Sequence, residues 1–256
     1  MRDIGGIWEQ IKTHRKNLND KEMQGIADVL LRGQEDWLGG KLRQREDEAL
    51  VLEFLGCMGR KGSVKAIEIL LQQLEAREEV LQAATAEALK RSQPLLALEP
   101  LAQMMLRQSQ SSIKAGEVLL SFGDEGVHAL WELWFGENKP SSLKAQILHL
   151  LAEAKDDRSE SLVFLGLLSK EEELIRAALI AADKMETKSL WRNVAGCLKN
   201  SSWQLRSRAI QLLSQWEEKR ALPYLRDMEA DADPWVEEER QKAITLLSED
   251  EEAKAE

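Results

Sequence analysis

The sequence contains few of the residues that bind metals or form disulfides. Among 256 residues there are two cysteines, three histidines and one tyrosine, and aromatic residues make up 5% of the chain. Cys57 and Cys197 belong to no CxxC pair, and His14, His128 and His149 are far apart with no HExxH sequence around them. Disulfide frameworks and zinc sites need closely spaced ligands. We therefore expect reduced cysteines, no metal and no cofactor.

Long apolar runs and nucleotide-binding motifs are also missing. No stretch approaches the roughly 20 apolar residues of a membrane span, and charges interrupt the N-terminal sequence MRDIGGIWEQ where a signal peptide would be apolar. Neither GxGxxG nor GxxxxGK[ST] occurs. The net charge of −10 disfavours general binding to nucleic acid. These absences predict a cytoplasmic protein without a membrane segment, for which nucleic acid is a disfavoured partner.

What the chain does have is a helical phrase that returns about every 31 residues. Clear copies occupy residues 81–89, 113–121, 143–151, 175–183 and 205–213, and fainter copies begin at Asp47 and Val236. A second amphipathic segment lies between consecutive copies, so each repeat consists of a helix A, a turn and a helix B. Such a period is typical of stacked helical hairpins.

The predicted fold is therefore all-α, a right-handed α-solenoid of about seven hairpins with an N-terminal capping helix near residues 4–16. We expect one continuous domain over residues 1–248, followed by an acidic disordered tail at 249–256. The tail sequence EDEEAKAE has no apolar periodicity.

Three positions of the phrase explain why the repeats would stack. The eighth position is always apolar, and the third is alanine in five of the seven copies, which predicts close helix packing at residues such as Ala177. The second position is always polar and about 120° from the eighth around the helix, so it should face outward. Its occupants are Glu48, Gln82, Lys114, Lys144, Arg176, Arg206 and Glu237. Of the eight tryptophans, we expect Trp134, Trp216 and Trp235 to fill gaps between helices.

The segment over residues 202–244 carries a family resemblance. Its phrases RALPYL (220–225) and DPWV (233–236) resemble tandem HEAT repeats of the short bacterial, PBS-lyase-like type, an armadillo-like fold. The resemblance extends over about residues 20–247 and departs from the pattern in the first and last repeats, where Glu237 replaces the usual Arg. It implies a curved solenoid whose B helices line a concave, protein-binding face. A di-iron hydroxylase built on such repeats would need paired His-Glu motifs, which this sequence does not contain.

One segment departs from the acidic character of the chain. Residues 184–226 hold nine cations and three anions, a net charge of +6, whereas residues 227–256 hold twelve anions and three cations, or −9. Opposite charges at these places can solvate neighbouring faces or pair with each other. Alternatively, they form a basic surface edged by tryptophan, since Arg and Trp are favoured anchors in binding sites.

The cations at the second position also have two interpretations. They can pair with an Asp of a neighbouring turn, forming a structural ladder, or they can form a basic stripe along the B helices, and the two roles are compatible because Arg can serve a carboxylate on each side. The residues predicted to bind a protein or acidic peptide are Lys114, Lys144, Arg176, Arg192, Lys199, Trp203, Arg206 and Arg208.

The sequence thus predicts a non-enzymatic scaffold for protein–protein interaction, with a monomer favoured and the oligomeric state left open. One alternative is a HEAT-like alkylpurine DNA glycosylase, for which Asp183 is the carboxylate nearest the basic segment among the repeat phrases. Another is an assembly factor of the chromophore lyase type, which no residue here distinguishes from other short HEAT proteins.

Overall fold

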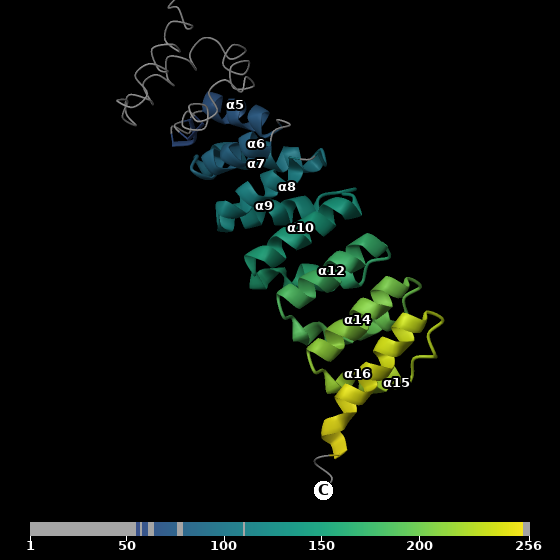
Figure 1. The fold of residues 1–256 in the computed structure, drawn as a ribbon. Coiled ribbons are helices and arrows are strands. Elements are labelled where there is room, and N and C mark those ends of the chain that lie inside the picture. The colour runs from purple at the N-terminus through teal and green to yellow at the C-terminus, as the bar shows by residue number, and fades with distance from the viewer. Residues whose placement is uncertain (1–54, 57, 61–63, 76–78, 110, 253–256) are drawn as a thin grey trace, which may run out of the picture. The chain divides into compact units, whose positions relative to one another are not determined.

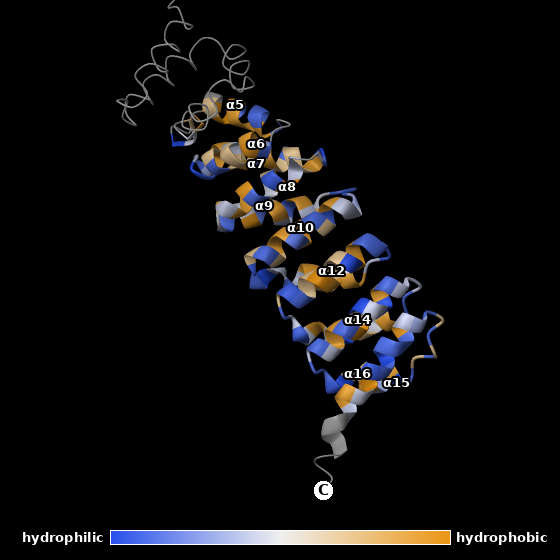
Figure 2. Ribbon diagram, in the orientation of Figure 1, coloured by the Kyte–Doolittle hydropathy of each residue, from blue (hydrophilic) through white to orange (hydrophobic). Residues whose placement is uncertain are grey.

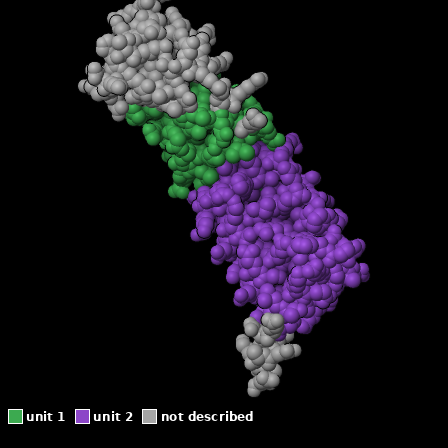
Figure 3. Space-filling model, viewed as in Figure 1, with its two compact units in different colours: residues 1–136 green, residues 137–256 purple. Residues whose placement is uncertain are grey.

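A computed structural model of the chain describes residues 55–56, 58–60, 64–75, 79–109 and 111–252, and no strand occurs within these ranges (Figure 1). The contacts between Cα atoms divide the chain into two compact units, Met1–Gly136 and Glu137–Glu256 (Figure 3). The predicted capping helix and the repeat that begins at Asp47 lie outside the described residues. The boundary of one domain over residues 1–248 stays a prediction.

In the first unit, helices A and B alternate along the chain. The B helices α6 and α8 pack on each other, and the A helices α5, α7 and α9 pack in a second layer against them. The bounds are α5 Val64–Leu74, α6 Glu79–Lys90, α7 Pro94–Leu106, α8 Ser112–Ser121 and α9 Asp124–Phe135.

The second unit repeats this arrangement. Its B helices are α10 Ser141–Ala154, α12 Glu172–Lys184, α14 Trp203–Gln215 and α16 Pro234–Glu252. Its A helices are shorter and are flanked by 3-10 turns: η3 Asp157–Ser159 with α11 Glu160–Leu167, then η4 Lys188–Leu190, α13 Trp191–Gly196 and η5 Cys197–Lys199, and last η6 Lys219–Ala221 with α15 Leu222–Arg226. Consecutive B helices pack together, and each A helix packs on the B helix that follows it.

The prediction of an all-α solenoid fold, made of stacked helical hairpins, is confirmed. The helices carry both apolar and polar residues along their length (Figure 2). The apolar eighth position is buried in the described copies except at Leu120, which is half-buried. The phrase therefore marks the core side of each B helix, because residues that recur with the helical period share one face.

The same turn closes three successive B helices of the second unit. After α10, α12 and α14, one residue adopts the left-handed conformation, with φ between 50° and 53°: Lys155, Glu186 and Glu217. The next residue donates its backbone N–H to the carbonyl five residues earlier, over 3.0 to 3.3 Å. This is the usual way to satisfy the last carbonyls of a helix, and its recurrence every 31 residues gives the A helices the same starting point.

Two predictions about packing were wrong. Trp134 and Trp216 are buried as expected, but Trp235 is 59% exposed, because it precedes the first buried residue of α16, Val236. The alanine in close contact is Ala178 and not Ala177, which is only half-buried. A Cβ atom placed on Gly166 of α11 would lie 2.8 Å from that of Ala178. Since one residue turns the helix by about 100°, α11 approaches the fourth position of the phrase on α12, whereas on α8 the third position, Ala115, is fully buried as predicted.

The predicted acidic tail begins inside a helix. Helix α16 continues to Glu252, so residues 249–252 are helical where a disordered tail was expected. Residues 253–256 lie outside the described part of the chain.

Candidate interaction surface

The Arg206 side chain, on α14, is part of the structure of the last repeats. Its Nε and Nη2 atoms lie 2.6 Å from Oδ2 and Oδ1 of Asp231, and its Nη1 donates to the carbonyls of Asn200 at 2.9 Å and Ser201 at 3.0 Å. The Asp231 side chain is 2% exposed and that of Arg206 15%. A bidentate pair of this kind holds both groups in fixed geometry. Of the two interpretations of this row of cations, the structural ladder therefore applies to Arg206.

Further hydrogen bonds extend from Asp231 into α16. Its backbone N–H donates to Glu237 Oε2 at 3.0 Å, and Glu237 in turn accepts from Arg240 at 2.8 and 2.9 Å. Arg240 is buried and donates to the carbonyls of Leu225 and Met228. The departure of Glu237 from the repeat pattern is thus matched by a second departure, since Arg240 stands where the preceding repeat has a buried alanine, Ala209.

These contacts shift the pKa values of both carboxyl groups downward. The side-chain hydrogen bond from Arg206 lowers the pKa of Asp231 against the opposing effect of burial. Hydrogen bonds from Arg240, from Gln241 and from the backbone of Asp231 lower the pKa of Glu237 to about 2. Both groups are therefore ionised at neutral pH, and each carboxylate has its own arginine, Arg206 for Asp231 and Arg240 for Glu237.

Arg208 also pairs between helices. Its Nη2 lies 2.6 Å from Oδ2 of Asp183 on α12, whose Oδ1 accepts from Gln215 Nε2 at 3.0 Å. Asp183 is the carboxylate on which the glycosylase alternative depends, and here it joins α12 to α14. The contacts of Asp183 with Arg208 and Gln215 thus have a structural role that does not require a nucleotide substrate.

Polar contacts of this kind recur along the B helices of the second unit. Lys184 of α12 pairs with Glu153 of α10, and Glu239 of α16 accepts from Ser207 and Gln211 of α14. The partners are separated by 28 to 32 residues, close to one repeat. The B layer is thereby cross-linked from α10 to α16 by groups that satisfy each other.

Two other cations of the predicted row, Lys114 and Arg176, pair within their own helices. Lys114 Nζ lies 3.0 Å from Glu117 Oε2 on α8, and Arg176 Nη2 lies 2.5 Å from Glu172 Oε1 one turn away on α12. Lys144 is half-buried on α10. Lys114 and Arg176 thus pair with a Glu of their own helix, and the pairing with a loop Asp is found at Arg206.

Trp203 is exposed, as the hypothesis of a binding role requires. It is the first residue of α14 and is 44% exposed. The pairing of Ser207 with Glu239 sets α14 and α16 in register, which puts Trp203 level with Trp235 on the next helix. Sequence reasoning missed Trp235 as an exposed residue, although the dipeptide that it forms with Pro234 at a helix start was a usable signal.

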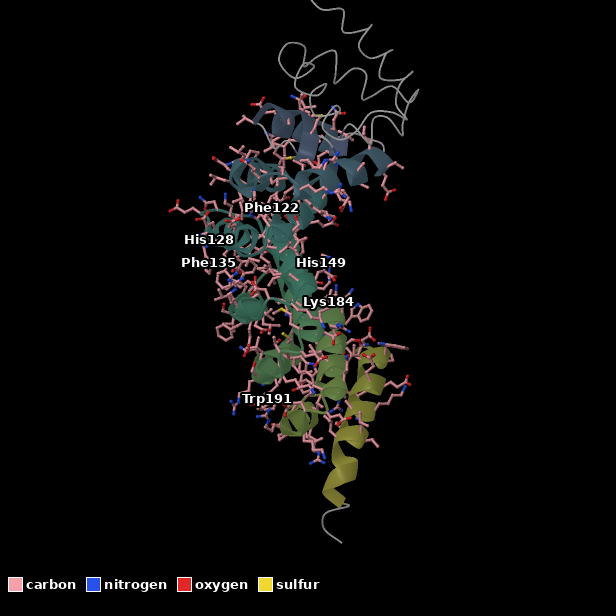
Figure 4. All side chains as sticks on the ribbon, turned by 90° about the vertical axis from the view of Figure 1, so that its left-hand side faces the viewer. Phe122, His128, Phe135, His149, Lys184 and Trp191 are labelled. Atoms are coloured by element: carbon pink, nitrogen blue, oxygen red, sulfur yellow. The ribbon has the colours of Figure 1, made fainter. Side chains whose placement is uncertain are left out.

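The remaining predicted residues, Arg192 and Lys199, belong to the A layer. In Figure 4, His149 and Lys184 lie on the side of the B helices in this unit, and Trp191 lies on the opposite side, among the A helices. The guanidinium carbons of Arg192 and Arg220 are each 4.9 Å from the centre of a Trp191 ring. Tyr224 meets Trp191 edge to face, with ring centres 5.9 Å apart. Arg220 is also paired with Glu218 at 2.7 Å, whose carboxylate caps η6.

Apolar side chains cover the neighbouring α11. Phe164, Leu165 and Leu168 are 38%, 42% and 58% exposed, and their spacing places them on one side of the helix. Helix α11 contacts α13, and Glu160 accepts a hydrogen bond from Ser189 of η4. We call the exposed side of these A helices the A face, defined by Phe164, Leu165, Leu168, Lys188, Arg192, Lys199, Arg220 and Tyr224.

The cations of the A face differ from those of the B layer in their partners. Within the described ranges, Lys188, Arg192 and Lys199 are exposed and form no ion pair with a carboxylate. The B-layer cations Lys184 and Arg208, in contrast, each meet a carboxylate of a neighbouring helix. The net positive charge of residues 184–226 is therefore left on the A helices.

His14 and Cys57 lie outside the described residues, and the other histidines and Cys197 do not assemble into a site within the described ranges. Among the residues whose positions are described, no cluster of three or more His, Cys, Asp and Glu side chains could hold a metal ion, and no helix is long and apolar enough to cross a membrane. His128 and His149 are exposed on separate helices (Figure 4). Burial raises the pKa of the Cys197 thiol to about 11.

Comparisons with known proteins give only distant likenesses. No family model matches the chain, and no curated protein matches it in sequence. An engineered protein has a similar structure, with a TM-score of 0.43 and 15% identity over 90% of this chain and 71% of its own. Human deoxyhypusine hydroxylase in complex with glycerol gives a TM-score of 0.40 and 15% identity over 91% and 92% of the two chains. A second engineered protein gives 0.38 and 16% identity over 85% and 97%.

Proposed function

We propose that the chain is a HEAT-repeat protein of the short bacterial type that acts as a non-enzymatic protein-interaction module in the cytoplasm. The aligned phrases and the stacked hairpins support the repeat type. The free, buried thiol of Cys197 fits a reducing compartment. The binding role rests on the surface described above.

The observation that carries the proposal is the uneven pairing of the cations. Arg206 and Arg208 are engaged by Asp231 and Asp183, so a partner at the B helices would have to displace ion pairs that join the repeats. In the part of the chain that the structure describes, no carboxylate pairs with Arg192 or Lys199. We therefore propose that the partner binds the A face. This keeps Arg192 and Lys199 of the site predicted from the sequence and leaves out its residues on the B helices.

The A face also supplies what protein interfaces commonly use. Tyr, Trp and Arg are enriched in their central contacts, whereas most exposed surface contains only scattered apolar side chains. Tyr224 is 43% exposed and meets the buried Trp191, over which Arg192 and Arg220 lie, and α11 with its exposed apolar side chains packs against α13. Aromatic, cationic and apolar groups thus occur together on one set of neighbouring helices.

Site-specific photo-crosslinking in extract of the native cells tests the proposal. A photoreactive amino acid at Leu168, on the A face, should form one dominant adduct with a partner protein. The same group at Ile180, exposed on the B helix α12, is the matched control and should not form that adduct. Loss of the adduct in the Arg192→Glu/Lys199→Glu variant would support the A face. An adduct formed from Ile180 and absent from Leu168 would return the site to the B helices.

A further inference from the structure

Building on the proposed function, we infer that the A face binds an acidic amphipathic segment of a partner protein. The apolar residues of that segment would lie on α11, and its carboxylates would meet the cations of η4, α13 and η5. Three properties of the surface lead to this assignment: its exposed apolar side chains, the position of Arg192 over Trp191, and its local positive charge.

The apolar part of the A face lacks a cover within the described structure. Helix α11, with the sequence ESLVFLGL, buries Leu162, Val163 and Leu167 against its own unit and still exposes Phe164, Leu165 and Leu168. Contiguous exposed apolar side chains on a soluble protein commonly mark an interaction site. A ligand that contributed charge alone would leave these side chains in water.

The basic part is partly organised before any partner binds. Arg192 lies over Trp191, which is itself only 5% exposed and is also approached by Arg220 and Tyr224. A guanidinium stacked on an indole ring still has its N–H groups at the edge, where a carboxylate can accept two hydrogen bonds. Because the stacking restricts the side chain, less conformational entropy is lost on binding.

The local charge outweighs the net charge of the chain at this place. Charges separated by more than about 8 Å are largely screened at physiological ionic strength. A segment docked on α13 would therefore sense Lys188, Arg192 and Lys199 more than the acidic residues 227–256, although the whole chain carries −10. The expected affinity is salt-dependent for the same reason.

An acidic protein segment fits this surface better than nucleic acid does. A phosphate backbone would use the cations, but it has no apolar groups for Leu165 and Leu168, and the net charge of −10 opposes its approach. The chain's own acidic end, EDEEAKAE, has carboxylates but no large apolar side chain. An amphipathic segment satisfies both parts of the A face at once.

The test uses the full-length protein and a fluorescent helical peptide of about 18 residues, long enough for several turns. Glu occupies one side of the peptide and Leu and Phe the other. Fluorescence anisotropy should show binding that weakens at least about tenfold between roughly 50 and 300 mM salt. Two variants, Arg192→Glu/Lys199→Glu and Leu165→Ser/Leu168→Ser, should each weaken it by about tenfold or more, the usual effect of losing a central contact.

Control variants and peptides separate charge from the apolar contribution. Arg91→Glu/Lys139→Glu makes the same change in net charge at exposed or half-exposed sites outside the A face and should leave the affinity within about twofold. Circular dichroism confirms that every variant is folded. Equal binding of a peptide with Lys in place of Glu would overturn the acidic assignment, and equal binding of one with Ser in place of Leu and Phe would overturn the amphipathic assignment.

Two further results would overturn the inference and assign a different ligand to the A face. Tighter binding of a DNA duplex of about 20 base pairs, lost in the Arg192→Glu/Lys199→Glu variant, would assign the surface to nucleic acid. Self-association of the wild type that is lost in this variant and blocked by the peptide EDEEAKAE would assign it to the tail of a second copy. If crosslinking identifies a partner at Leu168 and the acidic peptide does not bind, the inference fails and the proposed function stands. If no partner is crosslinked at Leu168 and the acidic peptide does not bind, the proposed function and the inference are both wrong.

Discussion

Replacing Arg206 by alanine should destabilise the fold several times more than replacing Arg176 by alanine. Both arginines occupy the second position of the helical phrase, one on α14 and one on α12. The same substitution in two helices changes helix propensity equally, so this contribution cancels in the comparison. What remains is the difference in tertiary partners.

The magnitude for Arg206 follows from the groups that would lose their partner. Asp231, with a side chain 2% exposed, would be left without a counter-charge, and the carbonyls of Asn200 and Ser201 would each lose a donor. Removing one member of a buried ion pair costs about 3 to 5 kcal/mol. Since the Arg206 side chain is 15% exposed and water can reach part of the site, we expect a loss of about 3 kcal/mol.

The magnitude for Arg176 is that of an exposed pair on one helix. Both its side chain and that of Glu172 are 49% exposed. Pairs of this geometry contribute about 0.3 to 0.5 kcal/mol. The free energy of unfolding of the Arg176→Ala variant should therefore be close to that of the wild type.

Urea unfolding measures the loss of free energy of unfolding in both variants, and thermal unfolding measures the change in Tm, each followed by circular dichroism and tryptophan fluorescence. In a chain of this size, a loss of about 3 kcal/mol corresponds to a decrease in Tm of roughly 6 to 12 °C. An Arg206→Ala/Asp231→Ala double variant should be no less stable than the sum of the single changes predicts, because it leaves no unpaired charge. Equal losses for Arg206→Ala and Arg176→Ala would refute the structural role of the Arg206–Asp231 pair.

Three other perturbations test the packing and the charge network. Because the pKa of Glu237 is lowered from 4.5 to about 2 in the fold, its contribution should be fully present above pH 4.5 and lost as the pH falls toward 2; acid titration of the Glu237→Gln variant should show a weaker dependence in this window. Gly166→Ala should destabilise by about 1 to 3 kcal/mol through overpacking against Ala178, and Ala178→Gly in the same chain should restore part of the space, as measured by urea unfolding; no loss in the single variant would contradict the close approach. Ala178→Asp should prevent stable folding by burying a charge, whereas Ala177→Asp, at a half-buried position, should be tolerated far better, and similar melting curves for the two would show that the helix phase is wrong.

The repeat and its core side could be predicted from the sequence because they depend on short-range periodicity. Burial of Ala182 and Leu212 follows from their place in a phrase that recurs every 31 residues or so, and an A helix lies between consecutive copies as the second amphipathic segment predicts. Such patterns are properties of one helix and its period. Trp203, Arg192 and Lys199 were identified differently, from the local excess of cations in residues 184–226, and all three are exposed.

The pairing of charges depended on tertiary structure. Arg176 and Arg206 occupy the same position in the phrase, but the first pairs one turn away on its own helix and the second reaches Asp231, 25 residues later in the chain. No periodicity distinguishes them, because the partner is supplied by a loop whose path the sequence pattern does not specify. For the same reason, the sequence grouped cations of the B helices with Arg192 and Lys199 in one expected basic surface. Only the assembled layers show that carboxylates of neighbouring repeats engage Lys184, Arg206 and Arg208, which leaves the A helices with the exposed positive charge.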